Sequence, residues 1–198
     1  SPSHQRALLR NLASSLFLTE EDTDDDNEPK VKGRVITTLQ KAKEVRPLVE
    51  RCITIARRGL VAMEDAEQYA VDAERHSEQW RAWRQSDKWN QWAQAMAPAV
   101  DARRRVLRLL GNKAAVSVLF DEVAPRYTDR PGGYTRIIRL AKPRLGDAGT
   151  RAILEFVGVR DRVSQRSVAP AFDSDAPAES SAEPEAVASS ESESKSEE

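Results

Sequence analysis

Three short runs rich in β-branched residues, separated by long stretches of helical periodicity, constrain the fold of this chain most. The runs cover residues 34–38, 134–140 and 151–157, and each is a predicted strand. Elsewhere, apolar side chains recur at three- and four-residue steps, which is typical of helices that bury one face. Because helices and sheets bury their apolar faces against each other, we expect an α+β fold with helices packed on one face of a small three-stranded sheet.

Two helices are predicted in the first third of the chain. The first covers residues 3–18, with Ser3 as its N-cap. The second begins at Leu39, and Pro47 should kink or restart it because proline has no amide hydrogen to donate. Gly59 is the candidate stop of this second helix, since glycine readily adopts the left-handed conformation that ends many helices.

Residues 61–97 have a different character and contain all four tryptophans. Their apolar and aromatic side chains follow alternating four- and three-residue steps, the spacing of a seam between two helices. We interpret the segment as an inserted helical hairpin whose two arms pack through the tryptophans, with Pro98 beginning the next helix. Aromatic residues at helical spacing are usually core, so a self-contained seam is favoured over an exposed docking surface or a platform for RNA bases. The tryptophans are Trp80, Trp83, Trp89 and Trp92.

The formal net charge of −1 conceals a strong separation of charge along the chain. Residues 19–28 hold seven acidic and no basic residues, and residues 161–198 hold ten acidic and three basic residues. The rest of the chain therefore carries a surplus of 13 positive charges. A basic body of this kind indicates nucleic acid or another polyanion as partner.

The same composition suggests the domain organisation. We expect residues 1–160 to form one α+β domain, with an acidic loop inserted at 19–33 and the hairpin at 61–97. From about Asp161 onward, Ser, Glu, Ala and Pro dominate and cannot bury enough apolar surface to fold. Residues 161–198 are therefore predicted to be a disordered acidic tail, which we suggest screens the basic body from non-cognate RNA.

The stretch from Arg126 to Ile137, RYTDRPGGYTRI, is the strongest candidate for a binding site. Gly132 and Gly133 have no side chains, so the backbone of another molecule can come close to this turn. The three arginines of the stretch can hold phosphates through paired hydrogen bonds. The pattern indicates polyanion binding, the alternative being an ordinary surface turn. Tyr134 either stacks on a base or packs the sheet, and packing is the favoured interpretation.

Other basic residues cluster on predicted helices and turns. Arg6 and Arg10 are four residues apart, so they share a helical face that can follow an RNA backbone or simply be solvated. The arginines between positions 103 and 108 favour phosphate contact, the alternative being pairing with acids of the hairpin. Lys142 and Arg144 lie in a turn-rich link from which they can reach a phosphate.

The sequence shows no pattern for catalysis, cofactor binding or metal binding. His4 and His76 are far apart and have no cysteine or aspartate at metal-ligand spacing. The single cysteine, Cys52, lies on an apolar helical stripe and is interpreted as a small core residue and not as a nucleophile. Phosphate-binding loops and nucleophile elbows are missing from the sequence, and no apolar run is long enough to span a membrane. We therefore expect no enzymatic activity, no cofactor, no membrane association and no small-molecule substrate.

Several blocks of this sequence, in order, resemble the bacterial large-subunit ribosomal protein seventeen family. The most specific block is APRY at 124–127 followed by RPGGYTRI at 130–137. The HQRALLRNL segment at 4–12 resembles the opening helix of the family. The resemblance extends over residues 3–18, 34–60 and roughly 98–158.

This resemblance implies a structural constituent of the ribosome that binds ribosomal RNA in the large subunit. The expected setting is the cytoplasm, on the ribosome, beside neighbouring large-subunit proteins near the exit of the nascent-peptide tunnel. Together, the residue patterns and the resemblance predict the following RNA-binding residues: His4, Arg6, Arg10, Asn11, Lys43, Arg126, Arg130, Gly132, Gly133, Tyr134, Thr135, Arg136, Lys142 and Arg144.

The sequence also departs from the family pattern. The family usually carries a strongly basic arm before its first helix, and this sequence does not contain that arm. Gln5 stands at a position where the family often has arginine. The chain begins with Ser-Pro-Ser and no initiator methionine, so we expect its natural start to have been trimmed. The acidic loop, the Trp-rich hairpin and the acidic tail extend beyond the usual pattern. An alternative function is therefore a protein–protein adaptor that docks through the Trp-rich hairpin.

Overall fold

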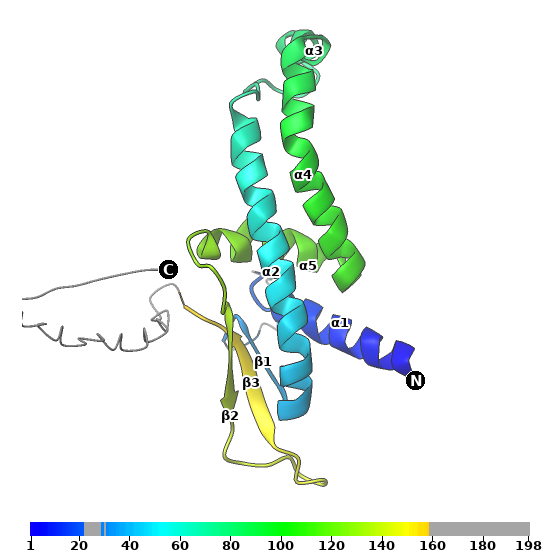
Figure 1. Cartoon of the computed structure of the whole chain (residues 1–198), viewed down its shortest axis with the longest axis vertical. Coiled ribbons are helices and arrows are strands. Elements are labelled where there is room, and N and C mark those ends of the chain that lie inside the picture. Colours follow the sequence, from blue (N-terminus) through cyan, green and yellow to red (C-terminus); the bar gives the residue numbers. More distant parts are fainter. Residues whose placement is uncertain (22–28, 30, 159–198) are drawn as a thin grey trace, which may run out of the picture. The chain divides into compact units, whose positions relative to one another are not determined.

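The three β-branched runs form an antiparallel sheet in the computed structural model of the chain, which describes residues 1–21, 29 and 31–158 (Figure 1). The strands are β1 (Arg34–Thr38), β2 (Thr135–Arg139) and β3 (Arg151–Phe156). β3 lies in the middle, with β1 and β2 on either side. The predicted strands are confirmed, and the second and third are shorter than predicted by one or two terminal residues.

Helices supply the rest of the fold, so the predicted α+β class is confirmed. A π-helical turn (Leu119–Val123) and a 3-10 turn (Ala124–Tyr127) lead from the last helix toward the Gly-Gly turn. The helices are α1 (Pro2–Leu18), α2 (Leu39–Glu67), α3 (Glu78–Gln85), α4 (Asp87–Leu110) and α5 (Lys113–Val118).

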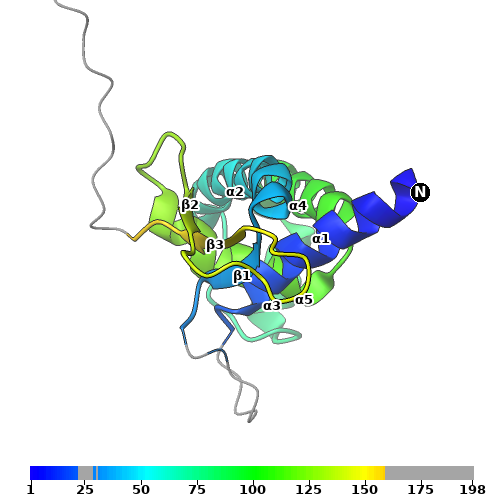
Figure 2. The same cartoon turned by 90° about the horizontal axis from the view of Figure 1, so that it is seen from below.

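The core lies where α2, the end of α1 and the α5 region meet one face of the sheet. Alternate residues of β3, Ala152 and Leu154, are fully buried on that face. Phe17 from α1 stacks on Phe156 of β3 with ring centroids 5.6 Å apart. α2 contacts both β2 and β3 and lies along the sheet, as the view from below shows (Figure 2). This packing fixes α1, α2 and the strand that follows the Gly-Gly turn relative to one another.

The predicted stop of the second helix at Gly59 is wrong, because α2 continues through it to Glu67. Gly59 is buried at the contact between α2 and α4. A Cβ atom there would lie 2.9 Å from the Cβ of Ala102 and 3.1 Å from Cε1 of Phe120. The glycine therefore permits a close approach of two helices, and its missing side chain serves packing and not a left-handed cap.

Two proline predictions and one cap prediction also need correction. Pro47 lies inside α2, which does not restart there, and Pro98 lies inside α4, which begins at Asp87. Extensive packing of α2 against α4 stabilises both helices across the hydrogen bonds that the prolines cannot make. The first helix starts at Pro2, with Ser1 and not Ser3 at its N-cap, because proline suits the first helical turn.

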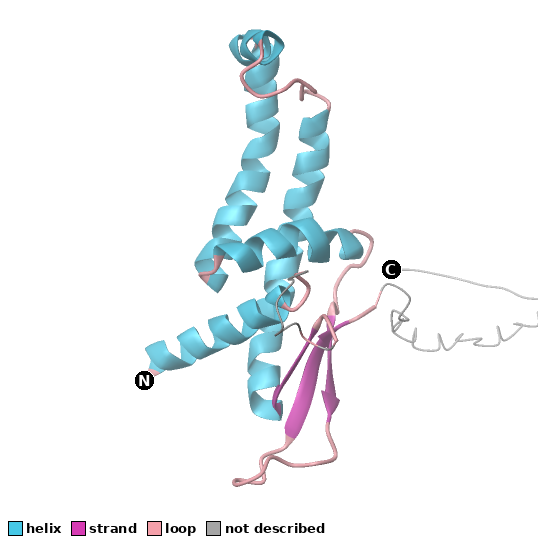
Figure 3. Ribbon diagram, turned by 180° about the vertical axis from the view of Figure 1, so that it is seen from behind, coloured by secondary structure: helices cyan, strands magenta, loops and turns pink. Residues whose placement is uncertain are grey.

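The helical hairpin exists, but its arms are α2 and α4. Residues 68–77 are not helical, so the predicted seam does not continue from α2 into α3. The tryptophans lie on α3 and at the start of α4, at the end of the hairpin farthest from the sheet (Figure 3). Where α3 meets the start of α4, Trp83 does pack against Trp89 and Trp92, as predicted. The long helices α2 and α4 meet through a different contact. The small residues Gly59, Ala99 and Ala102 make that contact.

All of these elements belong to one compact unit, Ser1–Asp161. Most of the predicted acidic loop and the whole of the predicted acidic tail lie outside the described residues. Among the described helices, none combines the length and the hydropathy that crossing a membrane would require.

Candidate nucleic-acid interface

The Gly-Gly turn is open to solvent and tied to α2 from behind. Gly132 and Gly133 have φ angles of +155° and +64°, and a Cβ atom on either would meet nothing within 4 Å. The Arg57 guanidinium, on α2, donates a hydrogen bond to the carbonyl of Arg130. Arg130 in turn donates from Nε to the carbonyl of Gly132 over 3.2 Å. A backbone that is both held and unshielded is suited to close contact with another backbone.

Tyr134 and Thr135, which follow the turn, anchor it and do not extend its surface. Tyr134 is 1% exposed and its ring lies 5.2 Å from that of Tyr127. Thr135 is 2% exposed and donates to the Glu50 carboxylate of α2 over 2.9 Å. Because both side chains are buried, any contact that these two residues make with a nucleic acid would come from their backbone. The interpretation that Tyr134 packs the sheet is confirmed.

Arg126 and Arg136 share a groove with two carboxylates. Arg126 lies 2.8 Å from the Glu20 carboxylate, which is buried at the end of α1. This hydrogen bond raises the pKa of Arg126 above its ordinary value. Arg136 forms an ion pair with Glu155 of β3. Both guanidinium groups stay partly exposed, at 39% for Arg126 and 50% for Arg136. Each can therefore contact a phosphate while it also holds its carboxylate.

The loop between β2 and β3 is fixed by its own ion pair. Arg144 donates two hydrogen bonds to the Asp147 carboxylate, and this pairing lowers the pKa of Asp147 well below its usual range. The Arg144 amide also donates to the carbonyl of Gly149 over 3.0 Å. Lys142 is exposed in the same loop. The pair closes a hydrogen-bonded turn in which both basic side chains are exposed to solvent.

The first helix presents its predicted residues on an exposed surface. His4, Arg6, Arg10 and Asn11 are all exposed. His4 and Asn11 line a groove of about 410 Å³ between α1 and the start of α2. Lys41 and Thr37 line the same groove. Arg6 and Arg10 lie outside it, and Lys43 is exposed on α2.

Apart from Lys43 on α2, the predicted residues fall in three places on the fold. One lies on α1, one surrounds the Gly-Gly turn, and one lies in the β2–β3 loop. The turn and the loop adjoin opposite ends of β2 (Figure 1). Sequence reasoning missed Lys41, Arg57, Glu20 and Glu50, each of which completes or supports one of these places. Only Lys41 had a usable signal, because a lysine in the first turn of a predicted helix beside Thr38 is expected to be exposed.

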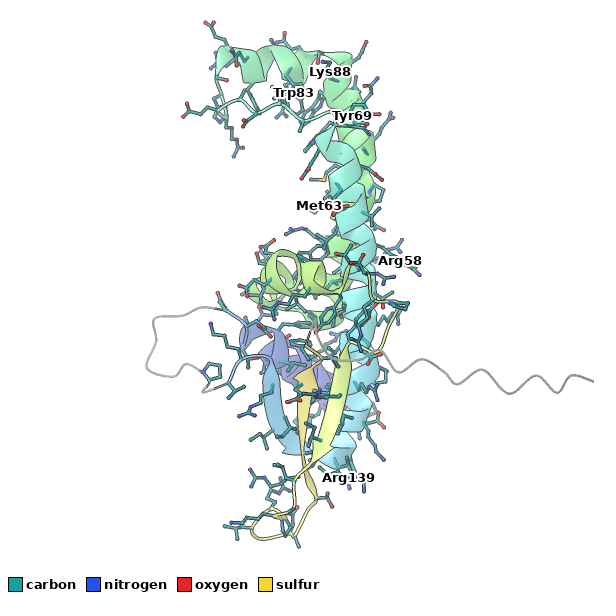
Figure 4. All side chains as sticks on the ribbon, turned by 90° about the vertical axis from the view of Figure 1, so that its left-hand side faces the viewer. Arg58, Met63, Tyr69, Trp83, Lys88 and Arg139 are labelled. Atoms are coloured by element: carbon teal, nitrogen blue, oxygen red, sulfur yellow. The ribbon has the colours of Figure 1, made fainter. Side chains whose placement is uncertain are left out.

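The four tryptophans form a cluster of their own at the end of the α2–α4 hairpin. Trp83 lies with its ring centroid 5.0 Å from Trp89 and 5.7 Å from Trp92, and its indole nitrogen donates to the carbonyl of Tyr69 over 3.0 Å. The Arg84 guanidinium covers both Trp80 and Trp89. All four are half-buried. Figure 4 labels Trp83 and Tyr69 at this end of the hairpin. Trp83, Trp89 and Trp92 contact one another, while Trp80 contacts His76 and Arg84, so the aromatic cluster is held by contacts within this end of the hairpin.

Cys52 is a core residue, as predicted. Its side chain is fully buried, and desolvation raises the pKa of the thiol to about 12. Among the described residues, no three histidine, cysteine or acidic side chains gather closely enough to hold a metal ion.

Comparisons with known proteins place this chain among ribosomal proteins. A family model described as Ribosomal protein L17 matches residues 8–157. The large ribosomal subunit protein bL17 of Rhodopirellula baltica is 62% identical over 194 residues, which cover 98% of this chain and 92% of that protein. The bL17 protein of Thermus thermophilus is 35% identical over 155 residues, covering 78% of this chain and 87% of that protein.

The family-model match and the similarity to bL17 proteins define the class of this chain, which is a structural ribosomal protein and not an enzyme. Within that class, the chain belongs to the ribosomal protein L17 family. The resemblance that the sequence blocks carried is thereby confirmed.

Proposed function

We propose that this chain binds large-subunit ribosomal RNA through phosphate contacts from α1, the Gly-Gly turn and the β2–β3 loop. Each of these places presents exposed cationic side chains, and the Gly-Gly turn and the β2–β3 loop are each held by hydrogen bonds. We assign this binding to residues 1–160. We further propose that the protein works in the cytoplasm, beside other large-subunit proteins near the exit of the nascent-peptide tunnel.

The observation that carries the proposal is the geometry of the Gly-Gly turn. Its two glycines face open space, while Arg57 holds the carbonyl of Arg130 behind them. Burial of Tyr134 and Thr135 fixes the strand that follows. A phosphate backbone can therefore approach the turn closely without first having to order it, which reduces the entropy cost of binding.

Sedimentation tests this function. A tagged full-length chain is expressed in bacterial cells and the lysate is run through a sucrose gradient at moderate salt. We expect the protein to sediment with large ribosomal subunits. Replacing Arg6→Gln and Arg10→Gln together should move part of it to the light fractions. The control, Arg75→Gln with Arg81→Gln near the aromatic cluster, removes the same charge from exposed positions and should leave sedimentation unchanged.

Recovery of the unaltered protein only in light fractions would contradict the proposal and favour the adaptor alternative. In that alternative the docking surface would be the half-buried tryptophans, three of which also contact one another.

A further inference from the structure

A second basic surface lies in a groove between α2 and α4. The groove encloses about 530 Å³, and four arginines line it, two from each helix. Thr54, Ile55 and Leu109 complete its lining and are half-buried. The arginines are Arg51, Arg58, Arg105 and Arg108, and we call this the four-arginine groove.

The packing of the two helices creates this arrangement. Arg51 and Arg58 are seven residues apart, so they lie on the same face of α2, separated by about 10 Å along the helix axis. Arg105 and Arg108 are one helical turn apart on α4. Gly59 lets α4 approach α2 closely, which brings the arginines of both helices to one groove.

The charge of the groove is mostly uncompensated within the described part of the chain. Arg105 forms an ion pair with Asp101 at 2.7 Å. For Arg51, Arg58 and Arg108, no ion pair joins them to any described carboxylate, and all three are exposed. Cationic side chains concentrated in a concave surface repel one another and produce a positive potential that attracts a polyanion.

This surface is separate from the three places of the proposed interface. Figure 4 shows the labelled Arg58 on the side of α2 that faces away from α1 and α5. None of the residues that line the groove belongs to the Gly-Gly turn, α1 or the β2–β3 loop.

We propose that the four-arginine groove binds the sugar–phosphate backbone of a second RNA segment, so that the protein joins two segments of RNA. This inference rests on the proposed function, since it takes the first segment to be held by α1 and the turn. A strand of B-form DNA carries one phosphate per roughly 3.4 Å of axis. At a spacing of that order, the distance between Arg51 and Arg58 along α2 corresponds to about three phosphates. The neutral floor leaves the guanidinium groups as the only charged contacts, so the groove would bind a backbone without reading its bases.

The test compares two triple variants of the full-length protein binding to deproteinised large-subunit ribosomal RNA. The groove variant carries Arg51→Gln, Arg58→Gln and Arg108→Gln. Its control carries Arg75→Gln, Arg81→Gln and Lys88→Gln, which remove three exposed charges near the aromatic cluster. We expect the groove variant to bind about tenfold to hundredfold more weakly at 0.1 M salt, and the control to bind like the unaltered protein.

Hydroxyl-radical footprinting of the RNA then distinguishes two segments from one. The groove variant should lose protection at one set of nucleotides, while the Arg6→Gln, Arg10→Gln variant loses protection at a different set. Unaltered affinity and footprint in the groove variant would overturn the inference and leave the proposed function standing. Tighter binding by the groove variant would also overturn it, since the arginines would then be holding acidic groups of the protein itself. Failure of the unaltered protein to bind the RNA would instead contradict the proposed function.

Discussion

Glu20 is the buried charge on which the region around the Gly-Gly turn depends. It is 6% exposed at the end of α1, and its carboxylate pairs with Arg126, in the 3-10 turn. A side chain at Gly33 would collide with this carboxylate, so the glycine before β1 leaves room for it. One ion pair thus joins the first helix to the segment that leads into the turn.

Replacing Glu20→Gln should therefore destabilise the fold by about 1–3 kcal/mol, less than a fully buried pair would lose because Arg126 stays partly exposed. Urea denaturation measures this change. The control is Glu122→Gln, since that carboxylate lies 3.9 Å from the same guanidinium but its side chain is 38% exposed, against 7% for the Glu20 side chain, and its loss should cost under about 0.5 kcal/mol. Equal effects of the two substitutions would contradict the importance of the buried pair.

A substitution at Gly133 can separate the cost of backbone strain from the loss of contact with RNA, because Gly111 provides a control with similar strain. Its φ of +64° is close to the +76° of Gly111, which ends α4, and a Cβ atom on either glycine would meet no other atom within 4 Å. Replacing either glycine with alanine should cost about 1–2 kcal/mol of stability. Only Gly133→Ala should also weaken RNA binding, by roughly tenfold, because its methyl group would occupy the approach to the turn. RNA affinity is measured by filter binding. Equal affinities of the two variants would show that the Gly-Gly turn does not contact RNA.

The buried thiol of Cys52 provides a simple check on the core. With its pKa raised to about 12, the thiol should react with iodoacetamide at pH 8 at least about a hundredfold more slowly in the folded protein than in urea. Fast alkylation of the folded chain, followed by mass spectrometry, would mean that α2 does not pack as described.

At the scale of elements, the α2–α4 hairpin depends on the absence of a side chain at Gly59. Alanine is the better helix former by about 1 kcal/mol, yet Gly59→Ala should lower the free energy of unfolding by about 1–2 kcal/mol because its methyl group overlaps Ala102. Adding Ala102→Gly should recover part of this loss, which a double-mutant cycle measures. A stabilising Gly59→Ala substitution would show that the helices are farther apart than described.

The contact between α2 and α4 at Gly59 shows why some elements could be predicted from the sequence and others could not. The strands depend on short β-branched runs such as residues 34–38, and the Gly-Gly turn depends on two adjacent glycines, so both were predictable from local sequence. The helix ends were not, because Gly59 and Pro98 are read as breakers until their packing partners are known. Tertiary packing overrode local preference at both positions.

The candidate site also contains residues that could be predicted from the sequence and residues that could not. Exposed arginines on α1 were predictable from helical spacing. The anchoring of Thr135 by Glu50 was not, because the two residues are 85 positions apart and neither carries a motif. For Tyr134 the sequence left stacking on a base and packing of the sheet open, with packing favoured, and its burial confirms packing.

At the scale of the whole molecule, the separation of charge along the chain determines how binding should behave. The basic surplus outside the two acidic segments is distributed over α1, the Gly-Gly turn, the β2–β3 loop and the four-arginine groove. Carboxylates such as Glu20, Glu155 and Asp147 hold individual arginines in place. Affinity should therefore come from several phosphate contacts on a preformed surface, with little contribution from reading bases.

The salt dependence of RNA binding tests this account most directly. The affinity of the full-length protein for deproteinised large-subunit ribosomal RNA is measured at salt concentrations from 0.05 to about 0.5 M, a range in which counterion release dominates. With about eight phosphates contacted, the logarithm of the binding constant should fall against the logarithm of salt with a slope on the order of −6 to −7. A slope near zero would contradict the central claim that cationic side chains hold the RNA backbone.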